Sequence, residues 1–362
     1  MHGLLPEDEL DEVRRLVRPN ILKLTPYRCA RDDYSEGTLL DANENSLGPP
    51  LEDDHHLRDE GLERYPCPYQ VDLKTAVANL RYRFPNPCRC KLYLMRHCCS
   101  QRDSSSPLED KHVFLGVGSD EVIDLMIRIA CIPRVDSILI TPPTYGMYSV
   151  CADIHDVNII KSPLVLTLPT GRYKGFVVVD EAYIDFTGSD SSSLAPLVTK
   201  YRRLVVTQTL SKGFGLAGIR LGIAFGDPAL IQLLSNVKAP YNINKLSSKV
   251  ALDALYVVLH AGRPCLQRND MSLQEKKKVI EALQASPYVK TVYASDSNFV
   301  LFECANAYQV YRKMAENGVV IRYRGNQHLL NNCLRATIGS PEENNRMLTM
   351  FATVSAEEAS MS

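Results

Sequence analysis

One lysine stands out in the sequence because of the residues around it. Lys212 lies in QTLSKGFGLAGIRLG (208–222), after the hydroxyl residues Thr209 and Ser211 and before a single arginine, Arg220. The glycines of this stretch let the backbone approach a ligand closely. A lysine amine in a partly desolvated pocket becomes a nucleophile toward carbonyls, and hydroxyls with an arginine fork suit a phosphate group. Taken alone, the stretch is equally compatible with a surface lysine on a glycine-rich turn.

Asp180 points this chemistry toward one cofactor. It ends the apolar run VVVDEAY, where a carboxylate is costly unless it is paired with a cation. A protonated pyridine nitrogen is such a cation, because at ~4 Å and an effective dielectric constant of ~20 the attraction is roughly 4 kcal/mol. Tyr183 follows three residues on and would reach the phenolic oxygen of the same ring. Amine, phosphate-binding groups and carboxylate together indicate a site for pyridoxal phosphate. A helix N-cap or a structural ion pair is the alternative for Asp180.

Two further segments fit such a site. In GVGSDE, Gly116 and Gly118 open a turn and Ser119 begins a helix, whose free amides attract phosphate. A plain capped helix is the alternative for this segment. Tyr145, in PPTYGMY, is suited to stacking on a flat ring and equally to ordinary core packing.

The hydrophobic pattern predicts the elements that position these residues. HVFLGVGSDEVIDLMIRIAC has the pattern of a strand, a turn and a helix whose Val122, Leu125, Met126 and Ile129 share one face. GFVVVDEAYIDF shows no polar alternation, which is typical of a strand buried on both faces. Strands that alternate with helices predict an α/β fold, with a mostly parallel sheet sandwiched by helices. Ligands bind beyond the carboxyl ends of such strands, and the candidate residues all fall there.

The pattern changes near residue 261. A charged amphipathic helix is followed there by a strand, a helix and a strand, which predicts a smaller α+β domain. We therefore expect an N-terminal arm with part of the small domain (1–62), a large cofactor-binding domain (63–262) and a C-terminal small domain (263–362).

Composition excludes some classes of function. The 362 residues are 45% apolar with a formal net charge of −1, which allows a large core and more than one domain and indicates no nucleic-acid or membrane-surface partner. No run of eighteen apolar residues is present, and the acidic start lacks the features of a signal peptide. We expect a cytoplasmic protein.

Cysteines are numerous but mostly scattered. Of eleven, only Cys88, Cys90, Cys98 and Cys99 cluster, beside His97. Such a group could bind a metal, but the spacing matches no common zinc module. We interpret it as a surface insertion and expect no metal site. The other cysteines are expected to be free thiols.

Several blocks together resemble the histidinol-phosphate aminotransferases, which are fold-type I pyridoxal-phosphate enzymes of the class II aminotransferase group. The blocks occur in the family's order and span nearly the whole chain. PYRCARDDY and CLRATIG favour this branch of the wider superfamily. The blocks are LDANENSLGP, RYPCPYQ, GVGSDE, PPTYGMYSV, VVVDEAYIDF, TLSKGFGLAGIRLG and CLRATIGSPEEN.

The resemblance implies a role in cofactor binding for each matching position. Lys212 would bind the cofactor covalently and move a proton between the substrate's Cα and the cofactor's C4′. Asp180 would pair with the ring nitrogen, Tyr183 would hydrogen-bond the ring's 3-oxygen and Tyr145 would stack on the ring. The cofactor phosphate would be surrounded by Ser119, Asp120, Thr209, Ser211 and Arg220, and reached by the partner subunit's Tyr65 in a homodimer.

The resemblance also implies the substrates, L-histidinol phosphate and 2-oxoglutarate, which would be converted to 3-(imidazol-4-yl)-2-oxopropyl phosphate and L-glutamate in histidine biosynthesis. Tyr27, Asn43 and Asn298 would line the substrate pocket. Arg322 and Arg335 would hold the phosphate of one substrate and a carboxylate of the other in turn, because the arginine fork accepts either anion.

One family element is missing. The family carries a strand, the motif NPTG and a helix between PPTYGMY and VVVDEAY, and the motif's asparagine hydrogen-bonds the ring's 3-oxygen. Here the interval after Leu166 reads TLPTGRYKGFVVVDE, with Leu168 in place of the asparagine. A crossover alone takes at least ~10–12 residues, so a strand and a helix cannot both fit.

Alternatives to the histidinol-phosphate activity therefore stay open. The chain could be another pyridoxal-phosphate-dependent amino acid aminotransferase, or an inactive relative damaged by the deletion between residues 160 and 178. The cysteine-rich segment 88–106 is a second departure from the family, and a wrongly joined transcript would explain both.

Overall fold

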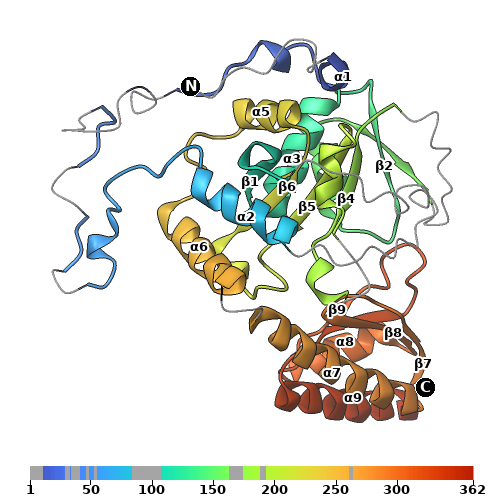
Figure 1. Ribbon diagram of the computed structural model, residues 1–362. Coiled ribbons are helices and arrows are strands. Elements are labelled where there is room, and N and C mark those ends of the chain that lie inside the picture. Colours follow the sequence, from blue (N-terminus) through green and yellow to red (C-terminus); the bar gives the residue numbers. More distant parts are fainter. Residues whose placement is uncertain are drawn as a thin grey trace.

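The computed structural model describes residues 11–28, 33, 41–45, 49–52, 55–83, 107–162, 174–187, 193–260 and 264–361. Figure 1 shows a larger body built around one sheet and a smaller body formed by the C-terminal part of the chain. The division of the chain near residue 262 stays a prediction, because residues 261–263 lie outside the described ranges. The cysteine cluster at 88–99 and the shortened interval at 163–173 lie outside the described residues.

The larger sheet has four strands among the described residues, in the order β1-β6-β5-β4. Strand β6 is antiparallel to both of its neighbours, whereas β4 and β5 are parallel. Three strands therefore share one direction and β6 opposes them, so the sheet is mixed rather than uniformly parallel. The strands are β1 (Val113–Val117), β4 (Val177–Asp180), β5 (Leu204–Thr209) and β6 (Leu221–Phe225).

Helices cover both faces of this sheet, which confirms the predicted α/β sandwich (Figure 1). One face packs against α3 (Gly118–Ala130) and α5 (Pro228–Val237), and α1 (Asp11–Arg14) adds to the same core. The other face packs against α2 (Val71–Arg83) and α6 (Lys245–His260). The predicted helical face is buried, since Val122, Leu125, Met126 and Ile129 all belong to the core under α3.

A separate pair of strands follows α3. Strands β2 (Ser137–Ile140) and β3 (Asn158–Lys161) run parallel on either side of α4 (Met147–Ile154) in the sequence. Among the described residues they pair only with each other. Short 3-10 helices complete this body at Ile21–Lys23, Arg58–Glu60, Asp110–His112, Ile184–Phe186, Ala195–Thr199 and Ala217–Ile219.

Strand β4 corrects one prediction. We expected this run to be buried on both faces, but Val177 and Val178 are 41% and 40% exposed. The reason is position: β4 is the last strand of the larger sheet, and no described residue pairs with its outer edge. The interval that should supply a further strand, between β3 and β4, is where the family element is missing.

The C-terminal residues form the predicted smaller α+β body. Its antiparallel sheet has the order β7-β8-β10-β9, and its helices pack on one face through Val300, Phe302, Leu334, Met314 and Phe351. The elements are α7 (Pro264–Ala285), β7 (Val289–Tyr293), β8 (Phe299–Cys304), α8 (Ala307–Glu316), β9 (Arg322–Tyr323), β10 (Cys333–Thr337) and α9 (Pro341–Met361). No helix in the described ranges is both long and apolar enough to cross a membrane.

Gly222 is the tightest point of the larger sheet. It pairs with Gly116 of β1 on one side and with Thr209 of β5 on the other. A Cβ atom at position 222 would lie 2.2 Å from the carbonyl carbon of Gly118 and 2.3 Å from the amide nitrogen of Ser119. Both of those atoms belong to backbone, so they cannot move aside as a flexible side chain would. Glycine at 222 therefore allows β6 to press against the start of α3.

We expect Gly222→Ala to lower the free energy of unfolding by about 1–3 kcal/mol, because the added methyl overpacks a backbone contact. Urea-induced unfolding would measure the change. Gly218→Ala is the matched control, since a Cβ there meets no atom within 4 Å, and it should alter stability by less than about 0.5 kcal/mol. Equal effects from the two variants would contradict the proposed close packing.

The exposed edge of β4 predicts a tendency to associate, because an unpaired edge strand templates pairing with other chains. We expect Val178→Lys to slow aggregation several-fold, since an edge lysine opposes strand addition. Light scattering during incubation at increasing protein concentration would measure this. Val257→Lys, at a 45% exposed position of α6, adds the same charge away from the edge. Equal slowing by both variants would attribute the effect to net charge and contradict edge pairing.

Candidate active site at the carboxyl edge of the larger sheet

The direction of the strands brings the candidate residues to one edge. Strands β1, β4 and β5 run the same way, so Ser119, Asp180 and Lys212 follow or end strands at a common border of the sheet. Strand β6 runs in the opposite direction and begins at this border, directly after Arg220. The convergence predicted from the sequence is therefore present in the fold.

One group of side chains surrounds the start of α3. Asp120 accepts hydrogen bonds from the Tyr145 hydroxyl at 2.9 Å and from the Arg220 guanidinium at 3.2 Å. Burial, followed by the hydrogen bond to Asp120, raises the pKa of Tyr145 to about 12. The Gly118 amide donates to the Arg220 carbonyl at 2.8 Å, which joins the two loops. Asp120, Tyr145 and Arg220 are thus in direct contact although they come from three separate segments.

Two hydroxyl groups lie at the end of β5. The Thr209 and Ser211 hydroxyl oxygens are 2.9 Å apart, and the Ser211 amide donates to Thr209 Oγ1 at 3.1 Å. The Thr209 hydroxyl also lies 3.1 Å from the Leu221 carbonyl, at the start of β6. These hydroxyls, the amides at the start of α3 and the Arg220 guanidinium form a donor set suited to a phosphate.

Asp180 is held by a residue that the sequence analysis did not identify. The Tyr148 hydroxyl donates to Asp180 Oδ2 at 2.8 Å, and the Ala182 amide donates to Oδ1 at 3.1 Å. Burial and the adjacent Asp180 charge raise the pKa of Tyr148, so this phenol stays a hydrogen-bond donor. Tyr148 lies three residues after Tyr145, and this spacing was the sequence signal that could have identified it. No lysine or arginine of the described residues forms a salt bridge with Asp180, which leaves the carboxylate available to a cationic ligand.

The Lys212 amine makes no hydrogen bond or ion pair with any described residue. We expected a partly desolvated amine, but in this single chain the side chain is exposed. Partial desolvation of this amine therefore stays a prediction, and a ligand or a second chain would have to supply it.

A network of polar side chains packs against the turn that carries Lys212. A Cβ at Gly213 would lie 2.5 Å from Asp185 Cβ, so the turn rests on Asp185. Arg81 of α2 donates to Asp185 Oδ1 at 3.1 Å and to Gln208 Oε1 at 2.6 Å. Gln208 donates in turn to Glu181 at 2.7 Å, and burial raises the pKa of that carboxyl. This network could not be predicted from the sequence, because its members come from distant segments.

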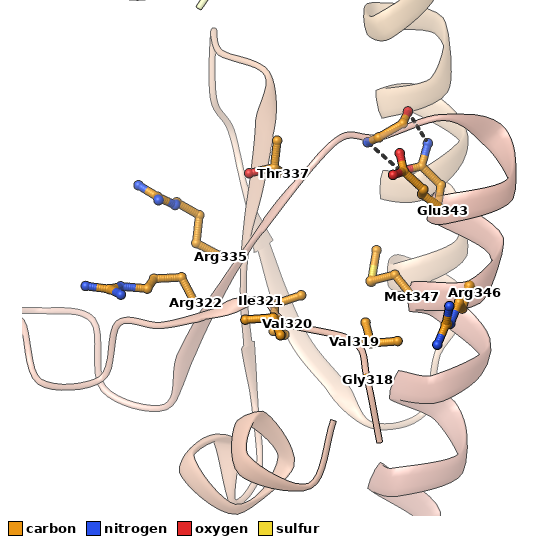
Figure 2. A pocket seen from close by; sticks show the side chains of 12 residues that line it. Gly318, Val319, Val320, Ile321, Arg322, Arg335, Thr337, Glu343, Arg346 and Met347 are labelled. Carbon is orange, nitrogen blue, oxygen red and sulfur yellow. Dashed lines mark hydrogen bonds between the residues drawn. The ribbon is translucent and has the colours of Figure 1, made fainter. Parts of the chain in front are cut away.

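The candidate substrate residues of the smaller body lie together. Arg322 of β9 and Arg335 of β10 are directly opposite each other in the sheet, and Figure 2 shows both side chains extending to the same side. The Arg335 guanidinium carbon lies 5.1 Å from the ring centre of Phe299. Phe299 meets the ring of Tyr183 edge-on, with 5.5 Å between ring centres. Asn298 adjoins Phe299, and its carbonyl accepts from Ile338 at 2.9 Å.

Three other candidates lie in a different group. Tyr27 and Tyr65 are 58% and 51% exposed, and each ring contacts Tyr241, at 6.0 and 4.7 Å between ring centres. The exposed Asn43 precedes Glu44, whose carboxylate accepts from the Tyr65 amide at 2.7 Å. No contact among the described residues joins Tyr27, Asn43 or Tyr65 to Lys212 or Asp180. Their roles, and those of the residues above, stay predictions.

Comparison with known proteins gives two kinds of match. The family model for aminotransferases of class I and II matches residues 38–166 and 165–351. The two matched segments meet at the interval where the strand and NPTG motif are missing. The computed fold resembles solved histidinol-phosphate aminotransferases from Clostridium acetobutylicum and Sinorhizobium meliloti, the latter in complex with pyridoxal-5'-phosphate. The TM-score is 0.65 for both, at 22% and 17% identity, covering 82% and 88% of this chain and 92% and 90% of those chains.

Similarity to curated proteins is closer. The chain is 39% identical to histidinol-phosphate aminotransferase of Saccharomyces cerevisiae, over 94% of this chain and 97% of that protein. It is 38% identical to the enzyme of Candida maltosa, over 95% of this chain and 98% of that protein. The first alignment runs over 394 positions, more than the 362 residues present here, so the relative carries segments that this chain lacks.

A family match over most of the residues, with close relatives over nearly the full length, leads to one conclusion: the chain belongs to the aminotransferases of class I and II, in the branch of the histidinol-phosphate aminotransferases.

Proposed function

We propose that this protein is a pyridoxal-phosphate-dependent aminotransferase that interconverts L-histidinol phosphate and 2-oxoglutarate with 3-(imidazol-4-yl)-2-oxopropyl phosphate and L-glutamate. The observation that carries the proposal is the placement of Lys212 and Asp180 at the ends of neighbouring parallel strands. Among the described residues neither side chain has an ion-pair partner. Family membership and the names of the relatives support the same activity.

The residues present fit pyridoxal phosphate at both of its ends. The cofactor phosphate would be held by Ser119 and the first amides of α3, with Thr209, Ser211 and Arg220 beside them. The close backbone approach at Gly222 brings these groups together. Asp180 would hold the ring nitrogen in its protonated form, Tyr145 would stack on the ring and Tyr183 would donate to its 3-oxygen. When bound, the cofactor supplies an electron sink for the bond broken at the substrate's Cα.

Each protein group then has a distinct task. Lys212 would hold the cofactor covalently and, once displaced by the substrate's amine, move the proton between Cα and C4′. Tyr148 keeps the Asp180 carboxylate oriented, since its raised pKa keeps the phenol protonated. Arg81 and Asp185 support the turn that carries Lys212. Arg322 and Arg335 would bind the anionic group of each substrate in turn.

A homodimer is part of the proposal. Lys212 is exposed in the single chain, and an exposed aromatic cluster of Tyr27, Tyr65 and Tyr241 lies on the same chain. A second copy would cover apolar surface and exclude water from the amine. The partner subunit's Tyr65 would then reach the cofactor phosphate. The predicted cytoplasmic location also remains part of this proposal.

We expect the purified protein to turn yellow with pyridoxal phosphate and, after borohydride reduction, to carry the pyridoxyl group on the peptide that contains Lys212. Lys212→Ala should lose this label and at least ~10³-fold in amino-transfer rate, because it removes the proton carrier. Absorbance spectra and peptide mass spectrometry would measure both. Lys277→Ala, an exposed lysine of α7, should behave like the parent protein. A parent that stays colourless would contradict the proposed activity and support the inactive relative.

Substrate choice needs a separate measurement. Amino transfer to 2-oxoglutarate would be followed with L-histidinol phosphate and with aromatic amino acids on the same preparation. We expect a clear preference for L-histidinol phosphate. Equal rates with both amine donors would instead indicate an aminotransferase of broader or different specificity.

A further inference from the structure

A third arginine shares the sheet face of Arg322 and Arg335. The pairing of β9 with β10 continues one step beyond Tyr323, because the Arg324 amide donates to the Cys333 carbonyl at 2.8 Å. Side chains two residues apart on a strand point to the same face. Tyr323, between them, packs with the helices of the smaller body on the opposite face. Arg322, Arg324 and Arg335 therefore form one cluster, here called the arginine cluster.

The charges of this cluster are uncompensated among the residues that the structure describes. None of its three arginines forms a salt bridge with a carboxylate of the described residues. Glu303 lies on the neighbouring strand β8 but is held by Lys290 at 2.8 Å. Like charges directly opposite in a sheet are destabilising, and Arg322 and Arg335 are such a pair. We expect such a repulsion to be retained only where the two arginines serve a function such as binding.

Two observations indicate that an anion completes the cluster. The buried Nε of Arg335 has no hydrogen-bond partner among the described residues, and a buried donor without an acceptor is costly. Burial, followed by the charges of Arg335 and Arg322, lowers the pKa of Arg324. An anion placed among the three guanidinium groups would supply the acceptor and relieve the repulsion.

The cluster faces the proposed cofactor site. Arg335 lies against Phe299, and Phe299 lies against Tyr183 of the larger body. Tyr183 is also near enough to Arg324 to influence the pKa of that guanidinium. Arg346, by contrast, projects from α9 on the other side of the pocket of about 530 Å³ that Arg322 and Arg335 border (Figure 2). An anion at the cluster would thus belong to a molecule that extends toward the cofactor ring.

We propose that Arg324 is the third cation of the substrate's anion site and makes this site prefer a phosphate over a carboxylate. The inference rests on the proposed function. A carboxylate has one charge and two oxygens, which two arginine forks already satisfy. A phosphate monoester carries about −1.5 to −2 charge at neutral pH and three terminal oxygens. Arg324 therefore contributes to phosphate binding and little to carboxylate binding.

The test uses the protein saturated with pyridoxal phosphate, so that the cofactor-phosphate site is filled. Absorbance changes of the bound cofactor would report half-saturation by L-histidinol phosphate, L-histidinol and L-glutamate. In Arg324→Gln we expect half-saturation by L-histidinol phosphate to rise about 10- to 100-fold, because charge-assisted hydrogen bonds are lost. The values for L-histidinol, which lacks the phosphate, and for L-glutamate should change by less than about threefold.

Two variants serve as controls. Arg346→Gln removes the same charge from the opposite wall of the pocket and should leave all three values unchanged. Arg324→Lys keeps a point charge without the fork, so it should restore part of the phosphate affinity. Equal weakening toward L-histidinol phosphate and L-glutamate, or no weakening toward either, would overturn the proposal.

A second readout separates this inference from the proposed function. If the parent protein forms no coloured complex, the proposed function fails, and inorganic phosphate is then used with the cofactor-free protein. Millimolar phosphate should raise the unfolding temperature of the parent more than that of Arg324→Gln, because the variant lacks one cation of the arginine cluster. The cofactor-phosphate site is common to both proteins, so it does not contribute to the difference. Without phosphate, Arg324→Gln should unfold at the same or a higher temperature than the parent. If Arg324→Gln unfolds at a lower temperature than the parent, and phosphate raises the unfolding temperature of both proteins equally, Arg324 has only a structural role.

Discussion

The candidate site depends on one backbone contact, the approach of Gly222 to the turn between β1 and α3. Because β6 opposes the strands on either side, its first residues lie level with the last residues of β1 and β5. Without a side chain at 222, the start of α3, Arg220 and Thr209 come within reach of one small anion. Any larger residue would separate the amides of α3 from the guanidinium of Arg220. The steric constraint at a single glycine thus decides whether the phosphate-binding groups form one set or three isolated ones.

The interruption between β3 and β4 affects the sheet more than it affects this edge. Among the described residues β4 has no neighbour at its outer edge, and Val177 and Val178 are exposed. The strand still pairs with β5, so Asp180 keeps its place beside the end of that strand. The hydrogen bond from Tyr148 to Asp180 also joins α4 to β4 across the interrupted interval. The missing element therefore mainly lowers the stability of the β4 edge, while the groups that would hold the cofactor keep their positions at the ends of the strands.

The sequence predicted those features that depend on local pattern. The face of α3 and the position of Asp180 at a strand end follow from the periodicity of apolar residues, which the structure keeps. The direction of β6 could not be predicted, because IRLGIAFG has the same apolar character in either orientation. The burial of β4 was predicted wrongly, since burial depends on a neighbouring strand and not on the run itself.

Contacts between distant segments were the other limit. Arg81, Gln208 and Glu181 meet only because α2 packs on the larger sheet, and no local spacing relates them. Tyr148 was not predicted, because its hydrogen bond to Asp180 joins positions 32 residues apart and no local pattern relates them. The roles of Tyr27, Asn43 and Tyr65 were inferred from the family resemblance alone, and no contact between described residues joins them to Lys212.

The arginine cluster shows how function and stability oppose each other in the smaller body. Leu334 and Tyr323 pack one face of the β9–β10 pair into the core, and this burial holds the two strands in register. The same register places Arg322 opposite Arg335 on the other face, so core packing enforces the repulsion between them. A neutral residue in place of either arginine would remove that repulsion. Its persistence here, with an unsatisfied Nε beside it, is explained if the lost stability is recovered whenever the anion is bound. The free protein is then less stable than its fold allows, and part of the affinity for the anion is the relief of that strain.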